Sequence, residues 1–365
     1  MQQGTTVPKF ESTLKIGDKT IGSRHPTYFI ADIAANHDGD LERAKALIYL
    51  CAEAGADAAK FQHFTADTIV SDHGFRALGG EKSHQSNWKK PVFDVYKDAS
   101  VSLDWTQSLN ETCDKAGVAF ITSPYSMALV DHIDPFIPAY KIGSGDITWT
   151  AMIEYIASKG KPYILASGAS TLDEVHRAVL AGSNVNPQLC LMQCNTNYTA
   201  SLENFHYIQL NVLNTYRSMY PDLVLGLSDH TPGHATVLGA VALGAKMVEK
   251  HFTDDTTRVG PDHKFSMHSK SWKAMVQATR ELENALGTGV KVVEANEKQT
   301  VVVQRRAIRA KAALSAGCLL LDSHLEVLRP CPQDAIAPFQ IEIVVGRTLR
   351  RDVPAGEHLR WTDFE

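Results

Sequence analysis

Residues 223–252 read LVLGLSDHTPGHATVLGAVALGAKMVEKHF, and this stretch contains the unit from which the fold is built. Two short apolar runs, 223–228 and 246–252, flank an amphipathic segment over 235–243 that ends close to Gly244. Each run is short enough for a strand buried on both faces, and glycine at that point favours the end of a helix. The stretch therefore predicts a strand, a helix and a second strand.

The same unit recurs along most of the chain. Helical patterns lie between most of the apolar runs, at residues 41–54, 103–116, 127–134, 150–158, 171–180, 205–220 and 235–243. The runs themselves cover residues 28–34, 58–62, 119–123, 139–144, 162–167, 189–194, 223–228 and 246–252. Eight strands that alternate with helices predict an α/β fold of the (β/α)8 barrel type rather than a doubly wound sheet.

The rest of the chain divides at a linker. A long polar insertion over residues 63–102 interrupts the repeats, which is typical of a functional lid or a mobile surface excursion. After the last strand a helix over 271–286 is predicted, and the final residues show short β-like runs broken by turns. We therefore expect a barrel domain over 1–286, a linker over 287–304 and a small, mainly β domain over 305–365.

Composition excludes several classes of protein. The 365 residues carry a formal net charge of −5, so no global basic field is available to hold nucleic acid or an anionic membrane. No window approaches the roughly 20 apolar residues of a membrane span, and the N-terminus lacks the pattern of a secretory signal. The six cysteines form no CxxC pair, which favours reduced thiols in a cytoplasmic protein.

Polar residues cluster where the predicted strands end, on the face where barrel enzymes build their active sites. His230 and His251 end neighbouring strands at equivalent depths, so their imidazoles can converge. Two imidazoles with oxygen ligands suit a divalent first-row metal, although such a pair can equally serve as acid and base without a metal. A single buried histidine would more often be a paired core residue, but seven repeats share this placement.

Three lysines, Lys60, Lys141 and Lys250, also end predicted strands, and we expect all three to point into the barrel mouth. Several lysines in a partly desolvated cleft are costly unless an anion compensates them. A phosphate or carboxylate group is the expected ligand, because serines and the glycine-rich GSG and ASG turns add hydroxyl and backbone N–H donors. Those serines are Ser144, Ser167 and Ser228.

Taken together, the motifs resemble those of the sialic acid synthases, the phosphoenolpyruvate-dependent nonulosonate synthases. The resemblance is carried in order by IADIAANHDGD, AGADAAKFQ, KIGSGDI, LASGAS, QCNTNY, GLSDHTPG, VEKHFT and GPDHKFS. The final runs QRRAIRAKAALSAG, LRPC and VVGRTLRRDVPAGEHL resemble the antifreeze-like (SAF) domain that ends those enzymes. The resemblance covers nearly the whole chain.

This resemblance implies condensation of phosphoenolpyruvate with an N-acetylmannosamine-like aldose, which gives a nine-carbon 2-keto acid and phosphate. It implies a divalent metal on His230 and His251, best served by Mn²⁺, with Mg²⁺ or Co²⁺ as alternatives. The expected phosphoenolpyruvate-binding residues are Lys60, Lys141, Ser144, Ser167, Thr196 and Ser228. The expected sugar-binding residues are Asp146, Tyr198, Asp262 and Arg306. Asp32, Lys60, Lys141 and Asp146 are the expected catalytic residues.

Four positions depart from the family pattern and leave the identity of the aldose open. Asp32 and Asp146 stand where glutamate is usual, Ala166 precedes Ser167 where the family has serine and threonine, and Thr196 stands where asparagine is frequent. The resemblance also implies a domain-swapped homodimer in which Arg305 or Arg306 closes the partner's site. The alternatives are a 3-deoxy-aldulosonate phosphate synthase acting on a phosphorylated aldose, and a non-catalytic carbohydrate-binding or scaffold protein.

Overall fold

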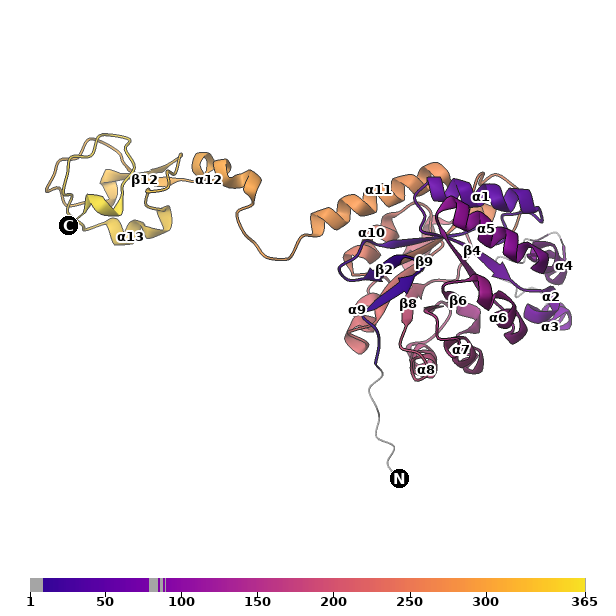
Figure 1. Ribbon diagram of the computed structural model, residues 1–365. Helices are drawn as coiled ribbons and strands as arrows, with labels where there is room; N and C mark the ends of the chain where they lie inside the picture. Colours follow the sequence, from indigo (N-terminus) through magenta and orange to yellow (C-terminus); the bar gives the residue numbers. More distant parts are fainter. Residues whose placement is uncertain (1–8, 79–84, 86–87, 89, 365) are drawn as a thin grey trace, which may run out of the picture. The chain divides into compact units, whose positions relative to one another are not determined.

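The computed structural model describes residues 9–78, 85, 88 and 90–364, which form two compact units, Met1–Gly287 and Thr288–Glu365. In the first unit every strand of the central sheet is parallel to its neighbours, and β10 pairs with both β9 and β3 to close a barrel (Figure 1). The barrel strands are β3 (Tyr28–Asp32), β4 (Ala58–His63), β5 (Ala119–Pro124), β6 (Tyr140–Ile142), β7 (Tyr163–Ala166), β8 (Leu189–Cys194), β9 (Val224–Asp229) and β10 (Met247–Thr253). The predicted (β/α)8 barrel is confirmed.

A helix follows each strand and covers the outside of the barrel. These helices are α1 (Leu41–Glu53), α5 (Thr106–Ala116), α6 (Met127–Ile133), α7 (Thr150–Ala157), α8 (Leu172–Ser183), α9 (Val212–Met219), α10 (Ala235–Ala242) and α11 (Ser269–Leu286). Asp40 caps α1 by accepting from two backbone N–H groups, and Gly117 ends α5 with a φ of 73°. The short strand β11 (Met267–His268) extends the sheet beside β10.

Alternation along the strands divides the apolar residues between two cores. Outward-facing residues such as Val248 and Phe252 of β10 pack against the helices. Inward-facing residues such as Ile30 of β3 and Met247 of β10 fill the barrel itself. Because both faces of every strand are buried, sequence alternation is weak, and a shift of one residue decides whether a side chain faces the barrel interior or a helix.

An antiparallel hairpin, β1 (Thr13–Ile16) and β2 (Lys19–Gly22), lies at the end of the barrel where the strands begin. Its Leu14, Ile16 and Ile21 are 1% exposed and belong to the interior core. The hairpin therefore closes the amino-terminal end of the barrel with apolar side chains. The sequence analysis did not predict this element.

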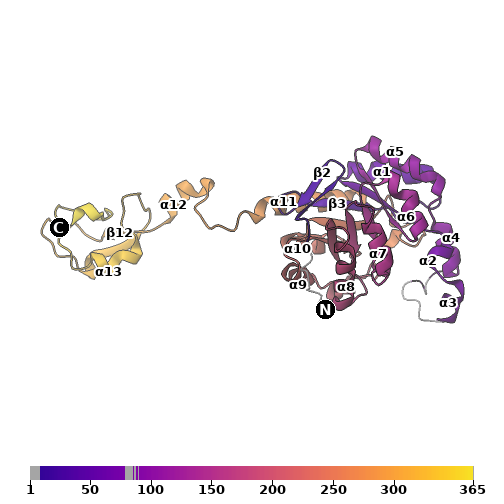
Figure 2. The same ribbon diagram turned by 60° about the horizontal axis from the view of Figure 1, so that its bottom comes forward.

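The insertion after β4 folds into three short helices, α2 (Ala66–Ile69), α3 (Asp72–Ala77) and α4 (Val92–Ala99). Both views show these helices grouped together and away from β2 (Figures 1 and 2). Part of the predicted insertion, residues 79–84, 86–87 and 89, lies outside the described residues. The insertion is thus a small helical layer that follows the carboxyl end of β4.

The second unit has its own core, formed by residues such as Ile308, Ile336 and Leu359 around the antiparallel pair β12 (Ala307–Ala310) and β13 (Leu325–Leu328). It also contains α13 (Ile341–Val344) and α12 (Lys298–Gln304), and α12 falls within the predicted linker. The carbonyl of Val302 in α12 accepts from the N–H of Cys331, so this part of the linker packs on the terminal unit. Within the described part of the chain, no helix combines the length and apolarity needed to cross a membrane.

Candidate active site

A small, deep cavity of about 40 Å³ lies at the carboxyl ends of the strands, and every barrel strand or the loop after it contributes to its wall. Its lining includes most of the residues that the sequence analysis selected. They are Asp32, Lys60, Lys141, Ser144, Tyr198, Ser228, His230 and His251. The register brings them together, because His251 pairs with Asp32 and Asp32 pairs with Lys60 on the adjacent strands.

Charged groups in this cavity form a buried network. The Lys60 amine forms an ion pair with Asp32 and lies 3.8 Å from Glu249 Oε1, while the Lys141 amine lies 3.1 Å from the same oxygen. Burial opposes the charge on Lys60, but Asp32 and Glu249 outweigh it and raise the pKa of that amine. Ser228 also donates to Glu249 Oε1 at 3.2 Å. The Glu249 carboxylate therefore links the two buried lysine amines of the deep cavity.

His230 and His251 face each other across the cavity with ring centroids 5.3 Å apart. Nδ1 of His230 donates to the carbonyl of Asn195 at 3.0 Å, so its Nε2 carries a free lone pair. Nδ1 of His251 is buried without a hydrogen-bond partner among the described residues. Burial lowers the pKa of each imidazole to about 3, so both rings are neutral at physiological pH. Neutral imidazoles are suitable metal ligands, and the backbone acceptor fixes the orientation of His230.

Two further carboxyl groups lie just outside the deep cavity. Asp262 lines an adjoining cavity of about 170 Å³ together with Tyr198, and its Oδ2 accepts from the N–H of Ala35. Burial raises the pKa of Asp262 to about 7. Asp146 lies in the turn after β6, which begins with the cavity-lining Ser144. Burial raises the pKa of Asp146 to about 6. Each can exchange a proton near neutral pH.

Three predicted site residues lie elsewhere. Ser167 is the residue after inward-facing Ala166, and its hydroxyl donates to the carbonyl of Met192 and accepts from Tyr216 of α9. Its side chain is therefore directed toward the helix layer. Thr196 packs beside Gly168 rather than in the deep cavity. Arg306 belongs to the second unit, where it donates to the carbonyl of Val327.

The expectation that Lys250 points into the barrel mouth is wrong. On β10 the inward-facing residues include Glu249 and His251, so Lys250 between them faces the helix layer. There its amine pairs with Asp229 and donates to the carbonyl of Thr231 at 2.6 Å. Lys250 therefore stabilises the connection between β9 and α10 and is not part of the anion site.

Replacing Lys250 with methionine is expected to lower the free energy of unfolding by about 3–5 kcal/mol, because the Asp229 carboxylate would stay buried without its cation. The KM for an anionic substrate that binds at Lys60 and Lys141 should stay within a factor of about two. Denaturant titration and steady-state kinetics on the same preparation measure both quantities. A large rise in that KM with unchanged stability would contradict the structural role.

Glu249 is the central residue that the sequence analysis did not select as a site residue. It occupies the middle of the network and contacts both cavity lysines. The signal was present in the sequence, since Glu249 and His251 are two residues apart and must share a strand face. Tyr125 and Cys194, which also line the deep cavity, had no comparable signal.

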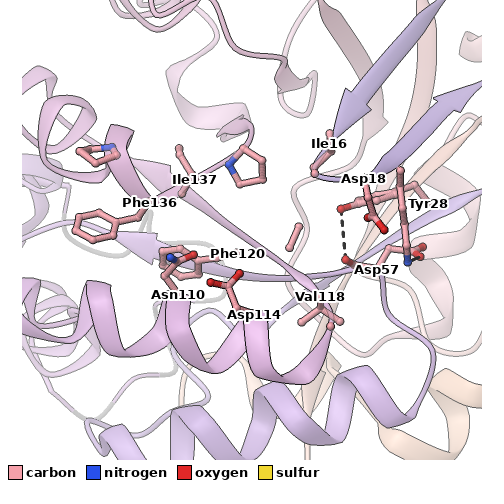
Figure 3. A pocket seen from close by; sticks show the side chains of 16 residues that line it. Ile16, Asp18, Tyr28, Asp57, Asn110, Asp114, Val118, Phe120, Phe136 and Ile137 are labelled. Carbon is pink, nitrogen blue, oxygen red and sulfur yellow. Dashed lines mark hydrogen bonds and ion pairs between the residues drawn. The ribbon is translucent and has the colours of Figure 1, made fainter.

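A different cavity, of about 450 Å³, lies where the hairpin meets the amino-terminal ends of the strands (Figure 3). Asp57 is prominent there, but its carboxylate accepts from the N–H of Phe29 at 2.7 Å and pairs with Lys19 of the hairpin. Asp57 is therefore a structural residue that holds the hairpin onto the barrel. In (β/α)8 enzymes this face contributes to stability.

The chain matches the model of the NeuB family over residues 47–291 and that of the SAF domain over residues 305–365. It is 33% identical over 355 residues to N,N'-diacetyllegionaminic acid synthase of Legionella pneumophila, covering 96% of this chain and 98% of that protein. It is 30% identical over 330 residues to human N-acetylneuraminate-9-phosphate synthase, covering 90% of each. The crystal structure of N-acetylneuraminic acid synthetase from Leptospira borgpetersenii matches with a TM-score of 0.69 at 26% identity, covering 80% of this chain and 96% of that one.

Proposed function

Because the chain belongs to the NeuB family of synthases, we propose that it condenses phosphoenolpyruvate with an N-acetylmannosamine-like aldose to give a nine-carbon 2-keto sugar acid and phosphate. One observation carries the proposal: two buried lysines and two neutral, facing imidazoles share one small cavity at the carboxyl end of the barrel. The lysines suit the anionic substrate, and the imidazoles suit a metal beside the aldehyde.

In the proposed reaction, phosphoenolpyruvate takes the place of Glu249 as the anionic partner of Lys60 and Lys141. Its C3 attacks the aldehyde carbon of the aldose, and a carbon–carbon bond forms while the C=O π bond breaks. The aldehyde oxygen takes up a proton and becomes a hydroxyl group, and C2 becomes electron-deficient. Water adds at C2, and the tetrahedral product loses phosphate to leave the 2-keto acid. We assign acceptance of the proton of that water to Asp32, and its contact with Lys60 and its distance of 3.6 Å from His251 support this assignment.

The metal site is proposed on the chemistry of its donors. His230 and His251 are neutral and face each other, and Nδ1 of His251 has no hydrogen-bond partner among the described residues, which fits a metal-binding pair. Among those residues no group of three or more histidine, cysteine, aspartate or glutamate side chains is arranged to hold a metal ion, so the proposed site has two protein ligands. Two protein ligands leave positions for substrate oxygen and water, as a catalytic ion requires. We propose Mn²⁺, which when bound would polarise the aldehyde carbonyl as a Lewis acid.

We further propose that the enzyme works in the cytoplasm as a homodimer in which the terminal domain supplies Arg306 to the partner's aldose site. The six cysteines are all free thiols, which fits a reducing compartment. The Arg306 guanidinium donates one hydrogen bond to the carbonyl of Val327, and its fork of five N–H donors can also bind a sugar oxygen or a carboxylate.

The proposed function predicts that phosphate release from phosphoenolpyruvate requires both an aldose and a divalent metal. A panel of free and phosphorylated aldoses, assayed with Mn²⁺ and after chelation, measures this requirement. The control omits the aldose while keeping metal and phosphoenolpyruvate. Release that needs neither aldose nor metal would refute the synthase reaction.

A further inference from the structure

Asp262 lies on the loop that follows β10 and not on a strand of the barrel. Two hydrogen bonds reach the residue itself: its Oδ2 accepts from the N–H of Ala35 at 3.1 Å, and its backbone carbonyl accepts from the hydroxyl of Ser266 at 2.7 Å. A side chain on a loop is placed only as precisely as the loop is held. The contacts that hold this loop therefore decide where the Asp262 carboxyl group lies in its cavity.

The next residue, His263, attaches the loop to the barrel. Its side chain is fully buried, with Nδ1 2.8 Å from Oγ1 of Thr253 at the end of β10 and Nε2 2.9 Å from Oδ1 of Asp38. A carboxylate only accepts hydrogen bonds, so Nε2 carries a proton and donates it to Asp38. The loop backbone also passes directly over the ring, because a Cβ atom at Gly260 would lie 2.6 Å from Cδ2 of His263. The imidazole thus joins the loop, β10 and the turn after β3.

Asp38 connects three segments of the chain through one carboxylate. Besides accepting from His263, it pairs with Nε of Arg43 in α1 at 3.1 Å and with Arg258 of the loop at 3.0 Å. Arg43 also donates both terminal N–H groups to the carboxylate of Asp254, at 2.7 and 2.6 Å. Bidentate pairs of arginine and carboxylate fix geometry as well as charge. The loop is therefore attached at its first residue and again at His263.

We infer that His263 and Asp38 are positioning residues for the second substrate: they hold the loop after β10 so that the carboxyl group of Asp262 stays in the cavity that His251 and Tyr198 also line. Because His263 is fully buried, it acts through Asp262 and not by contact with a substrate. The inference rests on the proposed function, in which Asp262 binds the aldose, and it adds two residues to which that function assigns no role.

Two substitutions at His263 test this role. His263→Phe keeps the bulk of the ring and removes both of its hydrogen bonds, whereas His263→Gln keeps an N–H donor for Asp38. With N-acetylmannosamine and Mn²⁺, His263→Phe is expected to raise the KM for the aldose at least about tenfold. The KM for phosphoenolpyruvate should stay within a factor of about two, since Lys60 and Lys141 lie on β4 and β6. His263→Gln should bring the KM for the aldose back to within about threefold of the unmodified protein.

Glu283→Ala is the matched control for lost stability. Glu283 accepts from both the N–H and the hydroxyl of Thr27, just before the start of β3 and so at the end of the barrel opposite the deep cavity. This variant should lower the free energy of unfolding in denaturant and leave the KM for the aldose unchanged. A rise in that KM as large as the one in His263→Phe would make the role of His263 merely structural and overturn the inference. Equal rises for both substrates in His263→Phe would overturn it too.

Limited digestion with trypsin tests the attachment of the loop without any substrate. The bond between Arg258 and Val259 is a trypsin site, and Val259 is 96% exposed, so opening of the loop should govern its cleavage. Cleavage there, measured by mass spectrometry, should be at least about fivefold faster in His263→Phe than in the unmodified protein or in Glu283→Ala. An unchanged rate of cleavage in His263→Phe would overturn the inference.

Asp38→Asn, at a partly exposed residue, provides the kinetic test if His263→Phe does not fold. It should raise the KM for the aldose about threefold without changing that for phosphoenolpyruvate, because it weakens the charge-assisted hydrogen bond from His263. No change in the KM for the aldose would count against the inference. Absence of phosphoenolpyruvate consumption by the unmodified protein with every aldose would instead refute the proposed function, while the rate of tryptic cleavage would still show whether His263 holds the loop.

Discussion

His251→Ala is expected to abolish metal-dependent turnover, with a loss of at least about a thousandfold, while the barrel stays folded. The ring lies in the deep cavity, where among the described residues Nδ1 has no hydrogen-bond partner and Nε2 lies 3.6 Å from an oxygen of Asp32, so its removal costs those residues no hydrogen bond. His230→Ala should have the same effect on turnover. Phosphate release with saturating Mn²⁺ measures the loss, and equilibrium dialysis measures Mn²⁺ binding without reference to activity.

His206→Ala is the matched control, because His206 is an exposed histidine outside the deep cavity and the adjoining cavity of about 170 Å³. It should bind Mn²⁺ and turn over as the unmodified protein does. The ligand assignment would be wrong if either His251→Ala or His230→Ala retained both full Mn²⁺ affinity and full activity. Thermal unfolding of each variant shows whether the protein is still folded, and so distinguishes the loss of a metal ligand from the loss of the fold.

Lys141→Met is expected to reduce kcat/KM for phosphoenolpyruvate by about two to three orders of magnitude. The Lys141 side chain is 3% exposed, and its amine lies 3.1 Å from Glu249 Oε1, so its charge is in the position that an anionic substrate needs. Removal of the amine also leaves the Glu249 carboxylate with a hydrogen bond from Ser228 and the more distant Lys60 amine, 3.8 Å away, which costs stability. Initial-rate kinetics at varied phosphoenolpyruvate concentration, together with denaturant unfolding, measure the two effects.

The double variant Lys141→Met with Glu249→Gln separates these contributions. It should recover much of the lost stability, since the carboxylate is no longer charged, but it should not recover use of phosphoenolpyruvate. Lys161→Met, a change at a partly exposed lysine paired with Asp134, serves as the control and should leave the kinetics unchanged. Normal kinetics in Lys141→Met would exclude this lysine from the anion site.

The barrel could be predicted from the sequence because each strand is a short apolar run that ends in polar residues, and each helix stops near a turn residue. Glycines such as Gly117 and Gly244, with φ values of 73° and 90°, occupy the positions that this pattern requires. The order of strands along the chain then fixes which ends meet at the mouth. The positions of Asp32, Lys60 and His251 along their strands were predictable in the same way.

The orientation of side chains was less predictable. Lys250 and His251 are adjacent, but one faces the helices and the other faces the barrel interior. In a strand with two apolar faces, the sequence shows where the strand ends and not which face a given residue occupies. Ser167 illustrates the same difficulty, since Ala166 takes the inward position. At β10 the spacing of Glu249 and His251, two residues apart, could have shown that these two side chains face the barrel interior and that Lys250 faces the helices.

The aromatic lining of the cavity of about 170 Å³ could not be predicted from the alternation of strands and helices. Phe64, Trp88 and Tyr96 lie in a polar insertion with no barrel periodicity, so their convergence depends on how α4 packs against the residues that follow β4. Contacts of this kind arise from tertiary packing rather than from local propensity.

The β1–β2 hairpin has a kinetic consequence for a barrel whose cavities lie in series. Leu14, Ile16 and Ile21 fill the amino-terminal end of the barrel, and the deep cavity lies at the opposite, carboxyl-terminal end. Under the proposed function, an aldose in the adjoining cavity lies beside the phosphoenolpyruvate that occupies the deep cavity. Under the proposed function, we expect phosphoenolpyruvate to bind first and the aldose second. Excess aldose should then hinder the binding of phosphoenolpyruvate and so inhibit the reaction.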